Sequence, residues 1–174
     1  LASNRAGMVY RLAGCRVGAR ELAERLDGNP AADVVLFVEG GAAVARREGS
    51  ELRFALEGDD WHLEGDAGVL DPVLYPNGLE RAWHAAVTRT AGDVLISATE
   101  GWELADGGGR HHVGGGSHGS LVAGDSYVPL IAAGFDQPPF PPDPSITDLA
   151  PLALAHFGVP APESMRRARE AARA

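Results

Sequence analysis

The sequence has 174 residues, a length that suits one globular domain. Hydrophobic residues make up 45% and charged residues 22%, which excludes wholesale disorder, and no apolar run approaches the ~18 residues that span a bilayer. The net charge of −9 is spread along the chain and forms no basic patch, so we expect neither a nucleic-acid partner nor a membrane partner.

The single cysteine, Cys15, excludes an intramolecular disulfide and a cysteine-based zinc cluster. The first five residues, LASNR, contain neither an initiator methionine nor the pattern of a signal peptide. We therefore expect the chain to be a piece of a longer protein whose localisation signals lie upstream. The scarcity of cysteine slightly favours the cytoplasm.

The first forty residues carry strand and helix patterns of ordinary length. Residues 7–13 alternate as a strand, and residues 17–26 have helical spacing that ends at Gly28-Asn29-Pro30. Residues 33–39 (DVVLFVE) form a continuous apolar run, typical of a strand covered on both faces.

A small antiparallel region is expected next. Glu48-Gly49-Ser50 separates two alternating segments, which is a hairpin signature, and residues 61–64 add a short strand. Residues 33–66 therefore predict a mostly antiparallel β lobe.

After Asp66 the pattern changes to a helix followed by a buried strand. Residues 79–88 form an amphipathic helix and residues 94–98 a short apolar strand, an order typical of an α/β sheet. Residues 101–124 then form a glycine-rich loop with three histidines. Loops of about twenty residues inside compact domains are usually functional or disordered.

The last third begins with a further strand pattern at residues 127–132 (YVPLIA). A proline-rich connector follows, and Thr147-Asp148 resembles the start of a helix that ends at Gly158. A charged helical tail occupies residues 163–174.

These patterns predict an α/β fold with a partial, mainly parallel sheet flanked by helices and a smaller antiparallel, cap-like lobe. The parallel strands are expected at residues 8–13, 93–98 and 127–132. The expected regions are a strand-helix lead-in, a small β-rich cap-like region, a C-terminal α/β core with the Gly/His loop, and a charged tail: residues 1–32, 33–75, 76–160 and 161–174. Open sheet edges and apolar faces predict self-association.

The motif that carries chemistry is GGGSHGS, residues 114–120, with His118 at its centre. Glycines on both sides remove side-chain bulk and permit unusual backbone angles, so the imidazole can be presented to a ligand. Imidazole is the commonest metal ligand in proteins. From the residues alone, His118 is a candidate metal ligand, a structural hydrogen-bonding residue, or simply exposed.

The second half of the chain resembles the final section of type I phosphodiesterase/nucleotide pyrophosphatase proteins, of the alkaline phosphatase superfamily. The resemblance covers residues 92–158 and rests on the order of its motifs. These are GDVLISA, GWEL, GSHGS, DSYVPLIA and ITDLAP, at residues 92–98, 101–104, 116–120, 125–132 and 146–151.

The resemblance implies a site with two divalent ions, usually zinc, and a Ser or Thr nucleophile that attacks phosphorus. His118 matches the last histidine ligand of that site. The nucleophile and the other ligands have no counterpart in this sequence, and one imidazole cannot hold a catalytic metal, which takes about three protein ligands. We therefore expect the intact protein to bind zinc or another divalent metal, and this chain alone to bind none tightly and to be inactive.

Five other residues are candidates for supporting roles. His111 and His112 could join His118 in a self-contained site, although adjacent histidines in a flexible loop usually lie apart. Asp125 and Ser126 could orient His118 from behind, or simply form the turn before the next strand. Trp102 could line a substrate pocket or pack under the loop.

Two functions follow. The first is part of a metal-dependent hydrolase of phosphate mono- or diesters, whose partners are a small phosphate-ester substrate and the missing N-terminal part of the same domain. The second is a non-catalytic module that binds a ligand or mediates oligomerisation.

Overall fold

The computed structural model describes residues 2–105, 116–134, 140–141, 144–163 and 165. The chain divides into two compact units, Leu1–Val128 and Pro129–Ala174, and each is described by itself.

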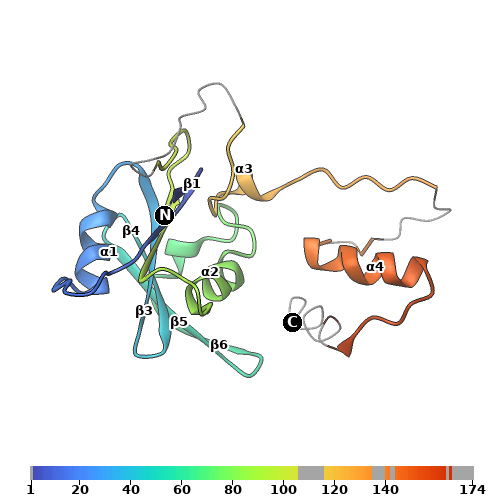
Figure 1. Ribbon diagram of the computed structural model, residues 1–174, viewed down its shortest axis with the longest axis horizontal. Helices are drawn as coiled ribbons and strands as arrows, with labels where there is room; N and C mark the ends of the chain where they lie inside the picture. The colour runs from blue at the N-terminus through green and yellow to red at the C-terminus, as the bar shows by residue number, and fades with distance from the viewer. Residues whose placement is uncertain (1, 106–115, 135–139, 142–143, 164, 166–174) are drawn as a thin grey trace. The chain divides into compact units, whose positions relative to one another are not determined.

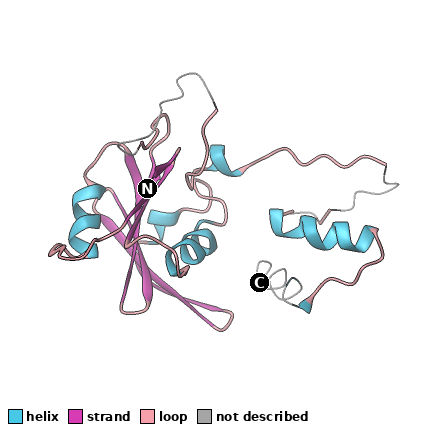
Figure 2. Cartoon of the chain, viewed as in Figure 1, coloured by secondary structure: helices cyan, strands magenta, loops and turns pink. Residues whose placement is uncertain are grey.

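The first unit is built on one sheet of seven strands (Figures 1 and 2). In the order in which they lie side by side, the strands are β1 (Ala2–Ser3), β2 (Ala6–Val9), β7 (Val94–Ala98), β3 (Ala32–Glu39), β4 (Ala42–Arg47), β5 (Ser50–Glu57) and β6 (Asp60–Gly65). Every neighbouring pair is antiparallel.

Tight turns set the register of strands β3 to β6. Glu39 pairs with Ala42 across Gly40-Gly41, and Arg47 pairs with Ser50 across Glu48-Gly49. All four turn residues have positive φ angles, between 50° and 83°. Such backbone angles match the twist of a two-residue hairpin and favour glycine, so the sequence prediction of a hairpin at Glu48-Gly49 is confirmed.

The two faces of the sheet carry separate cores. Helix α1 (Ala19–Asp27) covers one face, where Ala23 packs with Phe37 and Val44. The 3-10 helix η1 (Ala67–Leu70) and helix α2 (Gly78–Val87) cover the other face (Figure 1). Residues of β3 alternate between the two cores, which explains its continuous apolar run.

Aromatic side chains close the core beneath α2. Phe54, Trp61 and Trp83 lie with ring centroids 6.2–6.4 Å apart, and the two tryptophans meet edge to face. Tyr75 is fully buried in the same core. These contacts join β5, β6 and α2.

The predicted mainly parallel sheet is wrong. The strands expected to be parallel at 8–13 and 93–98 correspond to β2, which ends at Val9, and β7, and these two strands pair antiparallel. The expected antiparallel lobe is not separate either, because β3 pairs with β7 on one side and β4 on the other. Two-residue hairpins force antiparallel neighbours, whereas a parallel pair needs a crossover of about a dozen residues or more.

The strand expected at residues 127–132 is also absent, since these residues have no strand pairing in the structure. Pro129 has no N–H to donate to a ladder. Tyr127, Val128 and Ile131 are strongly exposed, so this apolar segment is not covered by a sheet partner. A short helix, α3 (Ala123–Ser126), precedes it.

The second unit contains the 3-10 helix η2 (Ile146–Asp148) and helix α4 (Leu149–His156). Ser145 and Asp148 form a reciprocal capping box in which each side chain accepts a backbone N–H of the other end. The sequence placed the helix start within two residues of this cap. The expected charged tail falls almost entirely outside the described residues.

Among the residues that the structure describes, no helix is long and apolar enough to cross a membrane.

Candidate functional site

His118 lies in a segment without regular secondary structure, residues 116–120, and is exposed. Its backbone carbonyl accepts a hydrogen bond from the Arg5 backbone N–H, at 3.0 Å. The following residue, Gly119, has a φ of +112°, a conformation that a residue with a side chain rarely adopts. The chain therefore turns immediately after His118 and enters the core at Ser120, which is 1% exposed.

Asp125 fixes Ser120 in this position. Asp125 Oδ2 accepts hydrogen bonds from the Ser120 backbone N–H at 3.0 Å and from the Ser120 hydroxyl at 2.7 Å. Arg5 Nε lies 3.0 Å from the same oxygen as an ion pair. The side chains of Arg5 and Asp125 are only 10% and 9% exposed, so the two charges neutralise each other away from solvent.

Arg81, on α2, holds the same segment by its carbonyls. Its guanidinium donates to Ser120 O at 3.1 Å, to Leu121 O at 3.2 Å and to Ser126 Oγ at 2.7 Å. Burial lowers the pKa of Arg81 below its usual value, because a charged guanidinium loses hydration in the core.

Strand β7 supplies the last contact. The Leu121 backbone N–H donates to the hydroxyl of Ser97, which is buried, at 2.9 Å. Arg5, Ser97, Arg81, Ser120 and Asp125 are called the loop anchor below. Its members come from the residue before β2, from β7, from α2 and from the loop itself.

The remaining sequence candidates are Ser126, Trp102, His111 and His112. The Ser126 hydroxyl donates to Val122 O at 2.7 Å and accepts from Arg81, so it links the anchor to the residues that follow it. Trp102 is 48% exposed in the segment after β7. His111 and His112 lie outside the described residues.

The described residues do not by themselves form a metal site. No group of three His, Cys, Asp or Glu side chains in that part of the chain is arranged to hold an ion. Asp125, the carboxylate nearest to His118 in sequence on that side, is engaged by Ser120 and Arg5. The Ser117 hydroxyl is buried without a hydrogen-bond partner, but a neutral hydroxyl and one imidazole fall short of the three or four ligands that zinc takes.

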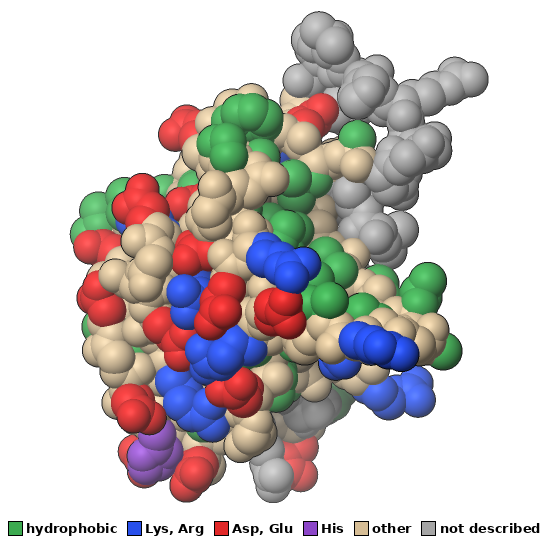
Figure 3. All heavy atoms as spheres, turned by 90° about the vertical axis from the view of Figure 1, so that its left-hand side faces the viewer, with side chains coloured by type: hydrophobic (Ala, Val, Ile, Leu, Met, Phe, Trp, Pro, Cys, Tyr) green, Lys and Arg blue, Asp and Glu red, His purple; other side chains and the backbone are tan. Residues whose placement is uncertain are grey.

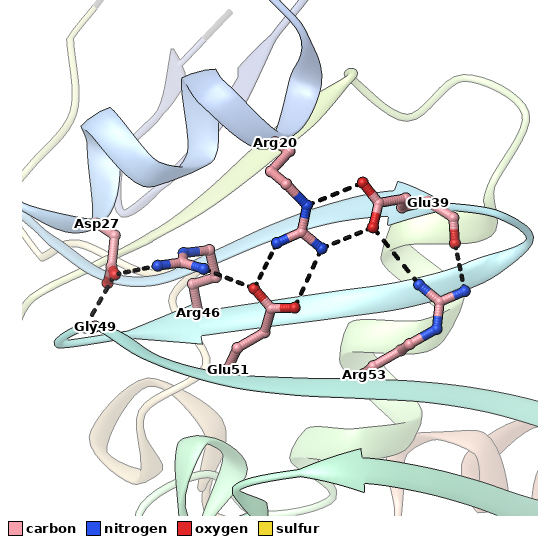
Figure 4. A network of polar contacts seen from close by, with 7 residues as sticks. All are labelled: Arg20, Asp27, Glu39, Arg46, Gly49, Glu51 and Arg53. Carbon is pink, nitrogen blue, oxygen red and sulfur yellow. Dashed lines mark hydrogen bonds and ion pairs between the residues drawn. The ribbon is translucent and has the colours of Figure 1, made fainter.

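A larger polar network lies on the opposite face of the sheet, beside α1 (Figure 4). Arg20 donates to both carboxylate oxygens of Glu39 and to both of Glu51, and its guanidinium stacks 5.2 Å from the centre of the Phe37 ring. The hydrogen bonds from Arg20 lower the pKa of Glu39 and of Glu51. Four of the five N–H donors of Arg20 are therefore used within the protein.

A third cluster joins Tyr75, Asp33 and Arg47. The Tyr75 hydroxyl lies 3.0 and 2.9 Å from the two oxygens of Asp33, and Arg47 Nε lies 3.0 Å from the first of them. Burial, followed by the hydrogen bond to Asp33, raises the pKa of Tyr75. The phenol stays protonated and acts as a donor in the core.

Sequence reasoning missed Arg5, Ser97 and Arg81. Arg5 stands in a segment without periodicity, and Arg81 sits among other polar residues on its helix, so neither has a linear signal. Ser97 interrupts the apolar run VLISA, and a serine inside a buried strand needs a hydrogen-bond partner. That signal pointed to a polar contact without saying to which residue.

Comparison of the chain with family models, with curated proteins and with solved structures finds no match.

Proposed function

We propose that the chain is part of a metal-dependent hydrolase of phosphate mono- or diesters, of the type I phosphodiesterase/nucleotide pyrophosphatase kind, and that it contributes the His118 imidazole to the metal site. The observation that supports this role is an exposed imidazole on a glycine-flanked segment whose neighbouring backbone is held by buried polar groups. A metal ligand needs access to the ion and a backbone held in place, and His118 is exposed on a segment whose main chain is hydrogen-bonded. The remaining ligands would come from outside the described residues.

The proposal gives the chain a defined task. Two metals stabilise the attacking and leaving oxygens of a phosphate ester and neutralise its charge, which a protein of net charge −9 would otherwise repel. Under this proposal the described residues contribute one imidazole and the main-chain contacts beside it.

The test is hydrolysis of bis(4-nitrophenyl) phosphate and of 4-nitrophenyl phosphate by the natural protein that contains this chain, supplied with Zn²⁺ or Mn²⁺. We expect His118→Ala to lower kcat/KM by at least about 100-fold, because loss of a residue that merely supports a metal ligand already costs about 10–100-fold. His84→Ala is the matched control, because His84 is also exposed, on α2. Equal activity of the two variants would rule out the role of His118.

The alternative, a non-catalytic module, is favoured by the apolar surface of the second unit. A pocket of about 380 Å³ lies along α4, and Ile131 and Phe157, which line it, are 87% and 78% exposed. Apolar surface of this kind marks binding or association sites. Under this alternative, light scattering shows an oligomer that Phe157→Glu disrupts, and neither phosphate ester is hydrolysed.

A further inference from the structure

We propose that Asp125, Arg5 and Arg81 are positioning residues, which fix the backbone on both sides of Gly119 and thereby set the direction in which His118 is presented. The inference rests on the proposed function of His118. None of the three need touch the imidazole, because they act through the main chain.

The first observation is where the hydrogen bonds converge. Within residues 118–121, the carbonyl of His118 and both the N–H and the C=O of Ser120 and Leu121 are engaged. Five hydrogen-bonded main-chain groups, on three of these four residues, leave little rotational freedom in the main chain. Glycine loses more conformational entropy on ordering than any other residue, so a segment with glycine on both sides of the histidine needs such bonds to become ordered.

The second observation is that these bonds come from separate elements. Arg5 precedes β2, Ser97 lies in β7, and Arg81 lies in α2. A local turn would be held by its own neighbours alone. Here residues 115 and 39 positions away in sequence, Arg5 and Arg81, bind Ser120, so the sheet and the helix dictate where the loop lies.

The third observation is the burial of charge. Replacing a buried ion pair by well-packed apolar residues is often neutral or stabilising, so stability alone does not account for Arg5 and Asp125. What apolar residues could not do is bind the N–H of Ser120 or align the Ser120 hydroxyl. The charged pair thus contributes geometry to the loop.

A cluster of similar chemistry elsewhere in the unit offers a matched control. Asp33 and Arg47 also form an ion pair of 3.0 Å, with Asp33 12% exposed, but they lie under Tyr75 and make no described contact with residues 116–121. Asp33→Asn should weaken a largely buried ion pair to a similar extent and leave the backbone beside His118 unchanged.

The first arm of the test is ¹⁵N relaxation of the 174-residue chain. In the unaltered protein the amides of residues 118, 120 and 121 should show order parameters near 0.85, typical of rigid backbone. Asp125→Asn should lower them to below about 0.6, while Asp33→Asn should leave them unchanged. Rigid amides in Asp125→Asn would overturn the proposal, and so would an equal loss in Asp33→Asn.

The second arm is activity of the natural protein on bis(4-nitrophenyl) phosphate. Asp125→Asn should lower kcat about 10- to 100-fold, and it should cause no further loss in a His118→Ala background, because both changes act on the same imidazole. If His118→Ala keeps full activity, the proposed function fails while the relaxation arm still tests the anchor. If His118→Ala is inactive but Asp125→Asn is normal, positioning fails alone.

Discussion

Two ion pairs of arginine and carboxylate lie on opposite faces of the same sheet and differ in their exposure to solvent. Beside α1, the side chains of Arg20 and Glu39 are 38% and 45% exposed, and basic and acidic groups mingle over that surface (Figures 3 and 4). In the loop anchor, the side chains of Arg5 and Asp125 are nearly buried. Asp125 binds both Arg5 and the backbone N–H of Ser120.

The comparison shows that two ion pairs of similar length, 2.7 Å for Arg20 with Glu39 and 3.0 Å for Arg5 with Asp125, need not contribute equally to stability. An exposed pair gains little over hydration and typically stabilises a protein by about 0–1 kcal/mol. A buried pair has given up its water, so removal of one partner leaves the other charge stranded, at about 3–5 kcal/mol. The exposed pair of Arg20 and Glu39 can therefore lose a partner at little cost to stability, and the pair of Arg5 and Asp125 cannot.

The largest expected effect is that of Asp125→Ala. It leaves Arg5 without a counter-charge and removes the acceptor of the Ser120 N–H, so the free energy of unfolding should fall by about 3–5 kcal/mol. Urea denaturation followed by circular dichroism measures it. A loss below about 1 kcal/mol would place the anchor in the same class as the surface network and remove the contrast.

Tyr75→Phe tests a buried neutral donor on a carboxylate. The variant keeps the ring and deletes the hydroxyl that contacts both oxygens of Asp33, and a hydrogen bond to a charged group stabilises by about 1.5–3 kcal/mol. Thermal and urea unfolding should show a loss in this range. Tyr127→Phe, at an exposed tyrosine, is the control, and it should change neither the thermal nor the urea midpoint of unfolding.

Glu51 gives a pH test of the network. The hydrogen bond from Arg20 holds its pKa below the ordinary value of 4.5, so the unfolded chain takes up the proton first in acid. The stabilisation is complete above about pH 4.5 and is lost as the pH falls through the folded-state pKa. Glu51→Gln should cost about 1 kcal/mol at pH 7, and its difference from the unaltered protein should shrink at pH 3. A difference that grows in acid would contradict this sign.

The smallest effect is expected for Glu39→Gln. Its removal leaves Arg20 paired with Glu51, so the urea midpoint should not change measurably in 1 M NaCl, where the Debye length is about 3 Å. A shift that persists at high salt would show that the outer network behaves like the buried anchor. Arg25→Gln, at an exposed helix pair, provides the comparison.

Much of the local structure could be predicted from the sequence. The helices at α1 and α2, the strands β3 and β7 and the hairpin at Glu48-Gly49 follow from periodicity and turn chemistry over a few residues. Their direction in the sheet could not be predicted in the same way. The apolar run of β3 fits a strand covered on both faces in either a parallel or an antiparallel sheet.

The candidate site likewise contains residues that the sequence indicates and residues that it does not. His118 stands out in the sequence because glycines surround it, and the role of Asp125 as a supporting residue was a hypothesis from its proximity. Arg5 and Arg81 could not be found, since a contact with Ser120 across 115 or 39 residues leaves no trace in local spacing.

The sequence by itself determined α1, α2, β3, β7 and the hairpin at Glu48-Gly49, because those states depend on backbone preferences and side-chain periods over short windows. The same reasoning failed at residues 127–132, which form no strand. Tertiary structure alone decided that one antiparallel sheet unites the strands, and that the buried Arg5, the half-buried Arg81 and Asp125 hold the segment next to His118. The physical reason is that strand pairing and charge burial depend on distance in space, and the chain reveals only distance along itself.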